Sequence, residues 1–413
     1  MLAEITPILA PTATEAAVLA RINGKLMLDR TCAWAAINSG SRNLAGLAAM
    51  ADALEPVLAA LGPVTRVAPA PVTAVDASGT PRPLAHGDNL HLRVRPEAPV
   101  RVLLTGHIDT VFAADHPFQS SRWLDATTLN GPGTADMKGG IAVMLAALEA
   151  VEASPFAGGL GYEVVLNSDE EVSSLGSAAL LREAAMRCHL GLTYEPALPD
   201  GTLAGARKGS GNFAAVVRGT AAHAGREPEK GRNAILAAAD LALRLAALVR
   251  PGLSVNPAKI DGGGPNNIVP DIAVLRFNVR PSSLADQAEA EAAIAAAIAA
   301  VAAQHDVTIA LDGSFARPPK PIDANQLRLF DLVRDCGEAM GLAVGWRDTG
   351  GVCDGNNLAA TGLAVVDTMG VRGGAIHSAD EFVLIDSFVE RARLSALVLL
   401  RVAAHGFARD GVA

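Results

Sequence analysis

Several segments of the sequence repeat one pattern, in which a continuous apolar run ends in polar residues and is followed by a helix-like segment. VRVLLTGHIDTVF (100–112), YEVVLNSDEEV (162–172) and LGLTYEP (190–196) all have this form. Continuous apolar runs are typical of strands that are buried on both faces of a sheet. The alternation of such strands with helices predicts an α/β fold that carries its functional side chains at the strand ends.

The pattern changes after about residue 212. Four strand-like segments and two helix-like segments, NAILAAADLALRLAALV (233–249) and LADQAEAEAAIAAAIAAVAAQ (284–304), follow within about a hundred residues. Four strands and two helices make a compact α+β unit. After residue 318 the α/β pattern resumes. We therefore predict a discontinuous core domain, residues 1–212 and 319–413, and an inserted α+β domain, residues 213–318.

Charge and hydropathy exclude several classes of protein. The net charge is −9 and no local basic stripe is present, so we expect no nucleic-acid partner. No stretch reaches 18 uninterrupted apolar residues, so we expect no membrane span. The N-terminal segment has an early acidic residue and no basic start before an apolar core, which favours a cytoplasmic location.

Two other classes find no support in the motifs. No GxGxxG or Walker pattern opens a helix after a strand, which argues against a nucleotide-binding protein. The four cysteines do not form a disulfide framework. We interpret Cys353, in the loop GGVCDGNN, as a small packing residue, because the sequence offers no evident histidine partner for a nucleophilic thiol.

Histidines and carboxylates gather at the predicted strand ends and in glycine-rich loops. Imidazole nitrogens and carboxylate oxygens are ligands of zinc, cobalt and manganese, and clustered carboxylates repel one another unless cations neutralise them. Each acid alone reads equally well as a solvated loop residue, but as a series they predict a divalent metal site. The series consists of His107, Asp109, Asp136, Asp169, Glu170, Glu171, Glu195 and His377.

Five motifs in this order resemble the metal-site motifs of the M20 metallopeptidases. They are GHIDTVF, GPGTADMKGG, NSDEEVSSLGS, YEP and GGAIHSADEFV. Within the inserted segment, GTAAHAG, NNIVP and FNVRP resemble the family's lid signatures, so the resemblance covers nearly the whole chain. The sequence is most similar to the glutamate carboxypeptidase branch, beside aminoacylases, desuccinylases and di- or tripeptidases.

The resemblance implies a fold and a cofactor. The core domain would be a zinc-exopeptidase-like catalytic domain with a mixed central sheet flanked by helices, and the insertion would be a ferredoxin-like lid and dimerisation domain. Two divalent ions, usually zinc with cobalt or manganese as alternatives, would be bound. Asp136 would bridge them, His107 and Glu195 would complete one shell, and Glu171 and His377 the other.

Two further acids receive roles. Glu170 is expected to be the general base and acid, because the family pattern places the base immediately before the ligand glutamate. Asp109 is expected to orient the imidazole of His107, with a strand-end capping acid as the alternative. We interpret Asp169 as a loop acid.

The inserted segment supplies three more candidates. A lone histidine such as His223, in a small-residue turn, is structural by default, but the resemblance implies that it reaches the active site of a partner subunit and stabilises an oxyanion. Asn267 and Arg280 are similar to lid residues that contact substrate, and an arginine suits a carboxylate, although Arg280 also reads as a solvated cation. Lys208, Arg226 and Arg317 are further cation candidates.

These observations together predict an enzyme. We expect a metal-dependent hydrolase that acts on a small N-acyl or peptidyl amino acid, with a metal-bridging hydroxide as nucleophile, and releases a C-terminal amino acid. A glutamate carboxypeptidase stands ahead of an N-acyl-amino-acid deacylase, and a homodimer through the lid is expected. A non-catalytic metal-binding relative is the remaining alternative, but such proteins usually lose a ligand or the base, and none is missing here.

Overall fold

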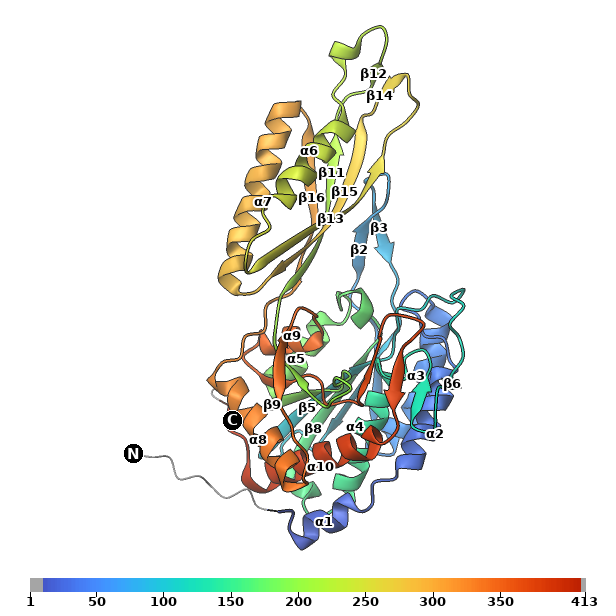
Figure 1. Ribbon diagram of the computed structural model, residues 1–413, viewed down its shortest axis with the longest axis vertical. Coiled ribbons are helices and arrows are strands. Elements are labelled where there is room, and N and C mark those ends of the chain that lie inside the picture. The colour runs from blue at the N-terminus through green and yellow to red at the C-terminus, as the bar shows by residue number, and fades with distance from the viewer. Residues whose placement is uncertain (1–9, 410–413) are drawn as a thin grey trace, which may run out of the picture.

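The computed structural model describes residues 10–409, which form two units joined end to end (Figure 1). The core unit holds both ends of the described chain. The inserted unit, residues 210–317, stands on top of it. Among the described residues, no helix combines the length and the apolar character needed to cross a lipid bilayer.

A mixed six-stranded sheet forms the centre of the core unit. Four of its strands run parallel, and two more join one edge in antiparallel fashion. The strands follow the order β1 (Val64–Val67), β4 (Asn89–Val94), β8 (Leu160–Asn167), β5 (Val100–His107), β9 (Leu190–Thr193) and β18 (Ala364–Val366). Because β8, β5 and β9 are parallel neighbours, their carboxyl ends meet at one edge of the sheet.

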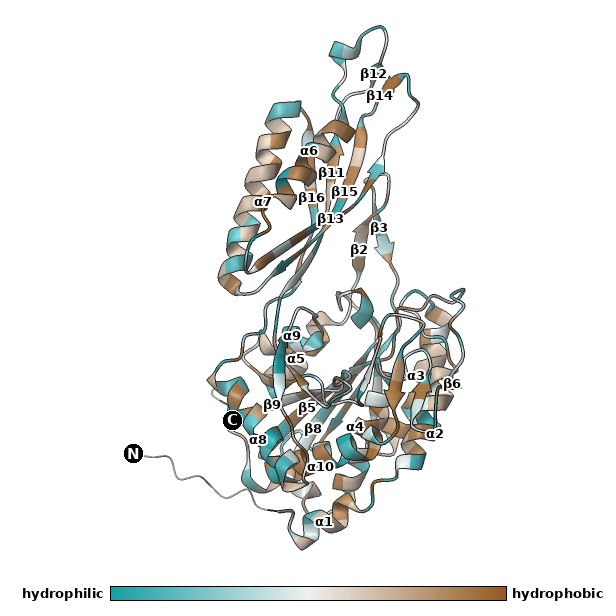
Figure 2. Cartoon of the chain, viewed as in Figure 1, coloured by the Kyte–Doolittle hydropathy of each residue, from teal (hydrophilic) through white to brown (hydrophobic). Residues whose placement is uncertain are grey.

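Helices cover both faces of this sheet, because successive side chains of a strand point to opposite faces. Leu104 of β5 packs into the larger helical layer and its neighbour Leu103 into the smaller one. The larger layer contains α1 (Ala13–Leu19), α2 (Gly24–Ala35), α3 (Leu44–Ala59), α4 (Lys138–Glu152), α8 (Ala324–Ala339) and α10 (Ser387–His405). The smaller layer contains α5 (Ala178–Arg187) and α9 (Asp354–Ala359). The outer helices carry both brown and teal residues, as expected for helices that bury one side (Figure 2). The predicted α/β fold class is confirmed.

Two glycines at the start of α4 allow a close approach of main chains. A Cβ atom on Gly140 would lie 2.0 Å from the carbonyl oxygen of Tyr194, and one on Gly139 would lie 2.4 Å from that of Thr134. Only a residue without a side chain fits at such distances. The first turn of α4 is thereby packed directly against the end of β9.

A small four-stranded sheet brings a C-terminal loop beside the loop that precedes α4. β20 pairs with β7 and also with β19, so residues near 377 lie next to residues near 133. The strands are β19 (Gly373–Gly374), β20 (Phe382–Leu384), β7 (Thr128–Asn130) and β6 (Arg122–Trp123).

The inserted unit is an antiparallel sheet with two helices on one face. Asn233 and Ser283 cap these helices by accepting hydrogen bonds from main-chain N–H groups of the first turn. The sheet and helices enclose an apolar cluster of their own, which includes Phe213, Leu241 and Leu275. The elements are β11 (Ser210–Arg218), β12 (Ala222–His223), α6 (Ala234–Ala246), β13 (Leu253–Gly262), β14 (Ile268–Val269), β15 (Ile272–Pro281), α7 (Leu284–His305) and β16 (Thr308–Arg317).

The chain crosses between the units twice, and the two crossings pair with each other. Arg207 and Lys320 exchange main-chain hydrogen bonds of 2.9 and 3.0 Å, and Ser210 pairs with Arg317. We call residues 207–210 and 317–320 the hinge ribbon. On its core side, β10 (Leu203–Arg207) pairs with β17 (Trp346–Thr349).

A third connection was not anticipated from the sequence. The hairpin of β2 (Val72–Val75) and β3 (Pro81–Leu84) leaves the core unit and packs on the helix-free face of the inserted sheet (Figure 1). Val75 is buried there against Val216 and Val274. Arg276 Nη2 donates a 2.7 Å hydrogen bond to the carbonyl oxygen of Val75. The inserted unit is therefore held by a packed contact as well as by its two covalent crossings.

Candidate metal centre

The five predicted metal ligands converge at the carboxyl edge of the central sheet. His107 is the last residue of β5, and Glu195 lies two residues beyond β9. Glu171 lies in a short 3₁₀ turn, Glu170–Val172, which follows β8. Asp136 precedes α4, and His377 lies in the loop between β19 and β20.

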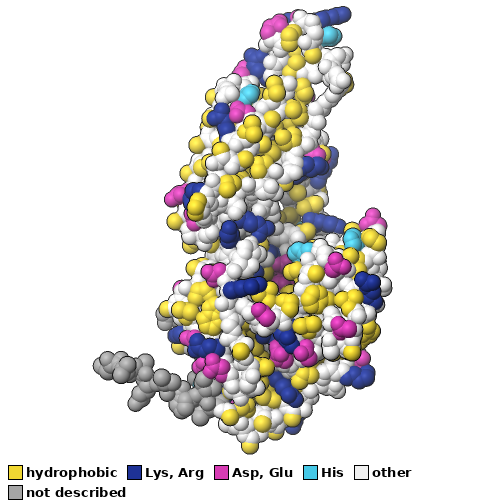
Figure 3. Space-filling view, viewed as in Figure 1, with side chains coloured by type: hydrophobic (Ala, Val, Ile, Leu, Met, Phe, Trp, Pro, Cys, Tyr) yellow, Lys and Arg dark blue, Asp and Glu magenta, His cyan; other side chains and the backbone are white. Residues whose placement is uncertain are grey.

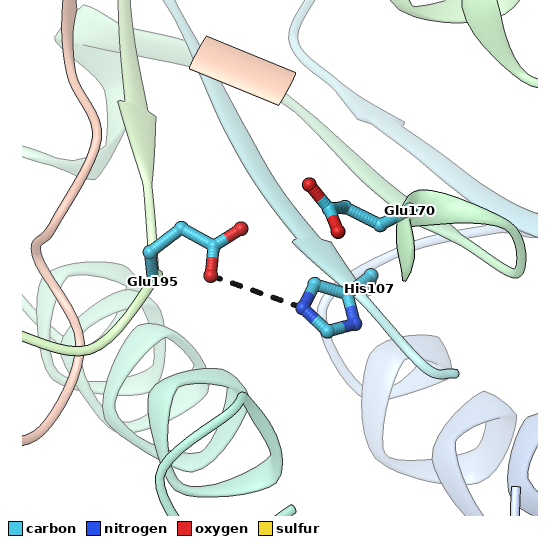
Figure 4. A group of neighbouring side chains, drawn as sticks. All are labelled: His107, Glu170 and Glu195. Carbon is cyan, nitrogen blue, oxygen red and sulfur yellow. Dashed lines mark ion pairs between the residues drawn. The ribbon is translucent and has the colours of Figure 1, made fainter. Parts of the chain in front are cut away.

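Asp136 lies between the two histidines. Its Oδ1 atom is 3.1 Å from His107 Nε2, and its Oδ2 atom is 3.3 Å from His377 Nε2. Glu195 Oε2 lies 3.8 Å from His107 Nε2 (Figure 4), and Glu171 Oε2 lies 3.2 Å from His377 Nε2. A carboxylate flanked on each oxygen by a separate histidine–glutamate pair has the arrangement of a bridging ligand.

The electrostatics of this cluster call for a cation. Burial, together with the charge of Asp136, raises the pKa of Glu171 to about 8 and also raises the pKa of Glu195. Glu195 Oε1 is buried and has no hydrogen-bond partner among the described residues. Hydrogen bonds to Asp136 and Glu171 raise the pKa of His377 to about 11. Because imidazole and carboxylate donors with a surplus of negative charge suit divalent ions, these residues fit a metal site.

Asp109 supports the site through its main chain and its side chain. Its carbonyl oxygen lies 2.9 Å from His107 Nδ1, which leaves Nε2 of that imidazole directed at Asp136. Its carboxylate accepts hydrogen bonds from Ser41 Oγ and from the N–H groups of Glu170 and Glu171. Asp109 thus ties the end of β5 to the turn that carries both glutamates.

Glu170 adjoins the cluster: its carboxylate, the imidazole of His107 and the carboxylate of Glu195 point toward one another (Figure 4), with one ligand atom of each within 4.8 Å of the others. Its Oε1 atom is 2.6 Å from Arg317 Nη1, and Arg317 Nη2 donates a 2.7 Å hydrogen bond to its carbonyl oxygen. Burial raises the pKa of Glu170 to about 7, although the charge of Arg317 opposes that shift. Asp169 is buried, and its carboxylate accepts hydrogen bonds from Gly176 N and Ser177 Oγ.

Comparison with known proteins identifies the family. The model of "Peptidase family M20/M25/M40" matches residues 103–401. This chain belongs to the M20 peptidase family. It is a metal-dependent hydrolase of that family, as the sequence predicted.

Individual relatives of this M20 chain differ in the activity that their names give. Carboxypeptidase G2 of Pseudomonas sp. (strain RS-16) is 29% identical over 386 residues, which cover 89% of this chain and 87% of the relative. A succinyl-diaminopimelate desuccinylase of Stenotrophomonas maltophilia (strain R551-3) is 32% identical over 73% of this chain and 84% of the relative. The solved structure of aminopeptidase PepT from Bacillus cereus ATCC 10987 shares the fold, with a TM-score of 0.70, 21% identity and coverage of 93% of this chain and 100% of that one.

A cavity of about 850 Å³ opens above this cluster of candidate ligands. Figure 3 shows the corresponding hollow between the two units, with acidic side chains inside it and basic side chains along its rim. Arg280 lines this cavity, and its Nη1 atom donates a 3.0 Å hydrogen bond to the carbonyl oxygen of Gly350. The arginines that line the cavity are Arg207, Arg280, Arg317 and Arg347.

His223 and Asn267 do not line this cavity. His223 belongs to β12, at the far end of the inserted unit in Figure 1, and its side chain is exposed. Asn267 is also exposed and lies beside it, because its carbonyl oxygen accepts a 2.9 Å hydrogen bond from Ala224 N. Of the three candidates from the inserted segment, only Arg280 therefore lines the cavity within one chain.

Cys353 lies in the wall of the cavity and is buried. Its Sγ atom accepts a hydrogen bond from Gly355 N at the start of α9. Burial raises the pKa of this thiol well above its usual value, which is the opposite of what a nucleophilic cysteine needs.

Sequence reasoning left three residues near the site without a role. Arg207, in the cavity wall, received none, and Arg317 was only one of several unranked cations. Glu381, which binds the main chain beside Asp136, was quoted inside the motif GGAIHSADEFV but not singled out. Its position in a metal-site motif was the one available signal, because its partners are backbone groups that no sequence pattern marks.

Proposed function

We propose that this protein is a dinuclear zinc hydrolase that cleaves an amide or peptide bond and releases a C-terminal amino acid, in the manner of a glutamate carboxypeptidase. The observation that carries the proposal is a cavity whose lining includes both the acid-rich cluster and four arginines. A cluster that can polarise a carbonyl thus shares one cavity with groups that bind carboxylates.

The metal ligands divide into two sets that share one member. His107 and Glu195 would hold one ion and Glu171 and His377 the other, with Asp136 common to both. Bound divalent ions would polarise the scissile carbonyl and make a water molecule acidic enough to attack it at neutral pH.

Glu170 would carry the proton in this reaction. Its carboxylate is not part of either proposed ligand set, although it lies within 4.8 Å of ligand atoms of His107 and Glu195. A pKa raised to about 7 suits a group that first accepts a proton from water and then donates it to the leaving amine. Arg317, 2.6 Å away, would hold the carboxylate in place between turnovers.

The cavity arginines favour a substrate with more than one carboxylate. Arg280 is anchored through the carbonyl oxygen of Gly350, so that its guanidinium group is fixed before a ligand arrives. A fixed guanidinium binds a carboxylate with little loss of side-chain entropy. Two of the other cavity arginines are already paired with carboxylates of the protein. Arg280 would therefore bind the α-carboxylate of the released residue, and Arg347, which also lines the cavity, favours an acidic side chain such as that of glutamate.

A second chain would complete the site. His223 and Asn267 lie too far along the inserted unit to reach the cavity of their own chain, so a catalytic role for His223 requires a partner subunit. Leu236 and Leu243 of α6 are 60% and 73% exposed, and β13 is an edge strand of the same sheet. An apolar helix face beside an unpaired strand supports dimerisation through the inserted unit.

The decisive experiment measures amino-acid release from a matched panel of substrates. N-acyl, dipeptidyl and aromatic-acyl glutamates are compared with the same compounds of leucine, using zinc-loaded protein and mass spectrometry. Release of glutamate in preference to leucine is expected. Preference for leucine would instead favour the second candidate, an N-acyl-amino-acid deacylase. The similarity to a succinyl-diaminopimelate desuccinylase supports this candidate.

Glu170→Gln tests the assigned base in the same assay. Loss of the proton acceptor should lower kcat by about 10²- to 10⁴-fold while two zinc ions per chain are retained. Glu97→Gln, the same change at an exposed glutamate of the core unit, is the control and should leave kcat unchanged. Full activity of Glu170→Gln would exclude Glu170 as the base, and absence of zinc from wild-type protein would exclude the metal centre.

A further inference from the structure

Glu381 is a buried carboxylate whose side chain accepts hydrogen bonds from main-chain N–H groups. Its Oε1 atom accepts hydrogen bonds of 3.0 Å from the N–H groups of both Ala135 and Asp136, and its Oε2 atom accepts one of 3.1 Å from that of Gly133. All three donors lie in the loop that ends in the proposed bridging ligand. A carboxylate that collects several backbone N–H groups fixes the path of that backbone.

The main chain of Glu381 strengthens the same connection. Its carbonyl oxygen accepts a 2.7 Å hydrogen bond from Asn130 Nδ2 and a 3.3 Å bond from Gly131 N. The segment from Asn130 to Asp136 is thus attached to one residue by both its side chain and its backbone. Glu381 is only 1% exposed, so water does not compete for these bonds.

The loop on the other side of Glu381 carries His377, and this loop needs an anchor. The side chain of His377 is 54% exposed, whereas the side chains of Asp136 and Glu171 are only 5% and 6% exposed. Ala375 and His377 have φ values of +51° and +64°, a conformation that costs free energy in residues other than glycine. A ligand in such a loop keeps its position only if neighbouring contacts hold the loop.

We propose that Glu381 is a positioning residue that holds the backbone of the Asp136 loop against the loop of His377, and so sets the spacing of these two metal ligands. Glu381 lies four residues after His377 and bonds directly to the N–H of Asp136. It connects the backbones of two ligands that are 241 positions apart in the chain, in addition to the direct contact of their side chains. This inference rests on the proposed metal centre.

The test uses Glu381→Gln in the full chain. The glutamine amide has nearly the same shape as the carboxylate. In the wild type both carboxylate oxygens accept main-chain N–H groups, whereas in the variant the NH₂ group would face one of these donors and could not accept its hydrogen bond. We expect the affinity for zinc, measured by competition with a chromophoric chelator, to fall by about 10- to 100-fold. The visible absorption spectrum of the cobalt-loaded variant should also change, because the ligand geometry shifts.

Two further variants make the result specific. Asp380→Asn applies the same chemical change to the exposed neighbouring residue and should leave zinc affinity and the cobalt spectrum as in the wild type. Glu381→Asp keeps the charge but is one methylene shorter, so we expect an affinity between those of the wild type and Glu381→Gln. If the glutamine variant does not fold, the aspartate variant alone decides.

A third measurement needs no metal. Hydrogen exchange of the metal-free protein should show faster exchange of the amides of Gly133, Ala135 and Asp136 in Glu381→Gln, with exchange in α7 unchanged. Wild-type zinc affinity and wild-type exchange in both Glu381 variants would overturn the inference. Failure of the wild type to bind zinc at all would instead overturn the proposed function.

Discussion

The metal centre and the hinge ribbon both bury several charges, but the two balance them differently. Against the hinge ribbon lies Asp367, which follows β18: its Oδ2 atom is 2.7 Å from Arg207 Nε and 2.6 Å from Lys320 Nζ, and its Oδ1 atom is 3.1 Å from Arg207 Nη2. One carboxylate therefore meets two cations. The metal centre has the reverse composition, because its buried carboxylates outnumber the histidines and the one arginine beside them. Its acids are Asp136, Glu170, Glu171 and Glu195.

The direction of the pKa shifts expresses this difference. Burial raises the pKa of a carboxyl group in both places. At Asp367 the charges of Arg207 and Lys320 outweigh burial, and its pKa is lowered. At Glu171 burial and the nearby Asp136 act in the same direction, and its pKa rises to about 8. A balanced cluster is complete as it stands, whereas an acid-rich one is built to receive a cation from outside.

The largest effect on stability is expected from breaking the balanced cluster. Asp367→Asn leaves two buried cations without a counter-charge, which should lower the free energy of unfolding by about 3–5 kcal/mol. Urea denaturation of the metal-free protein at neutral pH measures it. Asp29→Asn, which removes an exposed helix pair with Lys25, is the control and should cost about 0.5 kcal/mol or less. An equal loss of free energy of unfolding in the two variants would refute the claim that Asp367 balances two buried cations.

Withdrawal of the metal from one site should have the next largest effect. Zinc at a free concentration of one hundred times its dissociation constant should raise the free energy of unfolding by about 2.7 kcal/mol for each site, and a chelator should reverse the gain. In Glu171→Gln one ligand is lost, so most of the gain from its site should disappear. The metal-free variant should be no less stable than the metal-free wild type, because the change relieves repulsion from Asp136. A strongly destabilised metal-free Glu171→Gln would show that Glu171 is structural.

The smallest effect on stability is expected from a third charge cluster, which lies on the central sheet. Its arginine, Arg187, is partly exposed, so solvent weakens the ion pair. Glu163 accepts two 2.8 Å hydrogen bonds from Arg187 and lies 3.0 Å from His91 Nε2. Burial raises the pKa of Glu163, but these partners outweigh it and lower the pKa to about 2. The contribution to stability is therefore complete above pH about 4.5 and is lost as the pH falls towards 2.

Glu163→Gln tests this window. The variant should lose about 1 kcal/mol at pH 7 and show a shallower fall in stability between pH 4.5 and 2 than the wild type, as measured by urea denaturation across this range. A wild-type slope in the variant would mean that other acids govern the acid transition. The balance of burial and cations that lowers the pKa of Asp367 would then not account for the behaviour of Glu163.

The sequence was most informative where function depends on short, ordered motifs. His107, Asp136, Glu171 and Glu195 follow predicted strands or lie in a glycine-rich loop, and parallel strands bring such positions together for a general topological reason. The α/β class followed from the same alternation, whereas the mixed central sheet was implied by the resemblance to a family. His377 was selected as a histidine in a glycine-rich loop, and only the resemblance to a family assigned it to the second ligand set.

The contacts that the sequence did not reveal are long-range and weakly patterned. Arg207 and Asp367 are 160 positions apart, so nothing local pairs them. The hairpin of β2 and β3 has a short apolar pattern interrupted by prolines at 81 and 83, and its partner surface begins more than 130 residues later. Glu381 acts on backbone groups, which every residue possesses. Such contacts become visible only when the fold is complete.

The hairpin makes the inserted unit less modular than its covalent connections suggest. Two adjacent crossings would allow an engineer to excise residues 210–317 and join the ends, as is done with other domain insertions. Here the excision would leave Val75 without its partners and would leave the carbonyl oxygens of Val75 and Gly79 without the arginines that bond to them. A truncated core would need a polar replacement at Val75, or loss of the hairpin as well. The unit that can be exchanged between relatives is therefore the insertion together with residues 72–84.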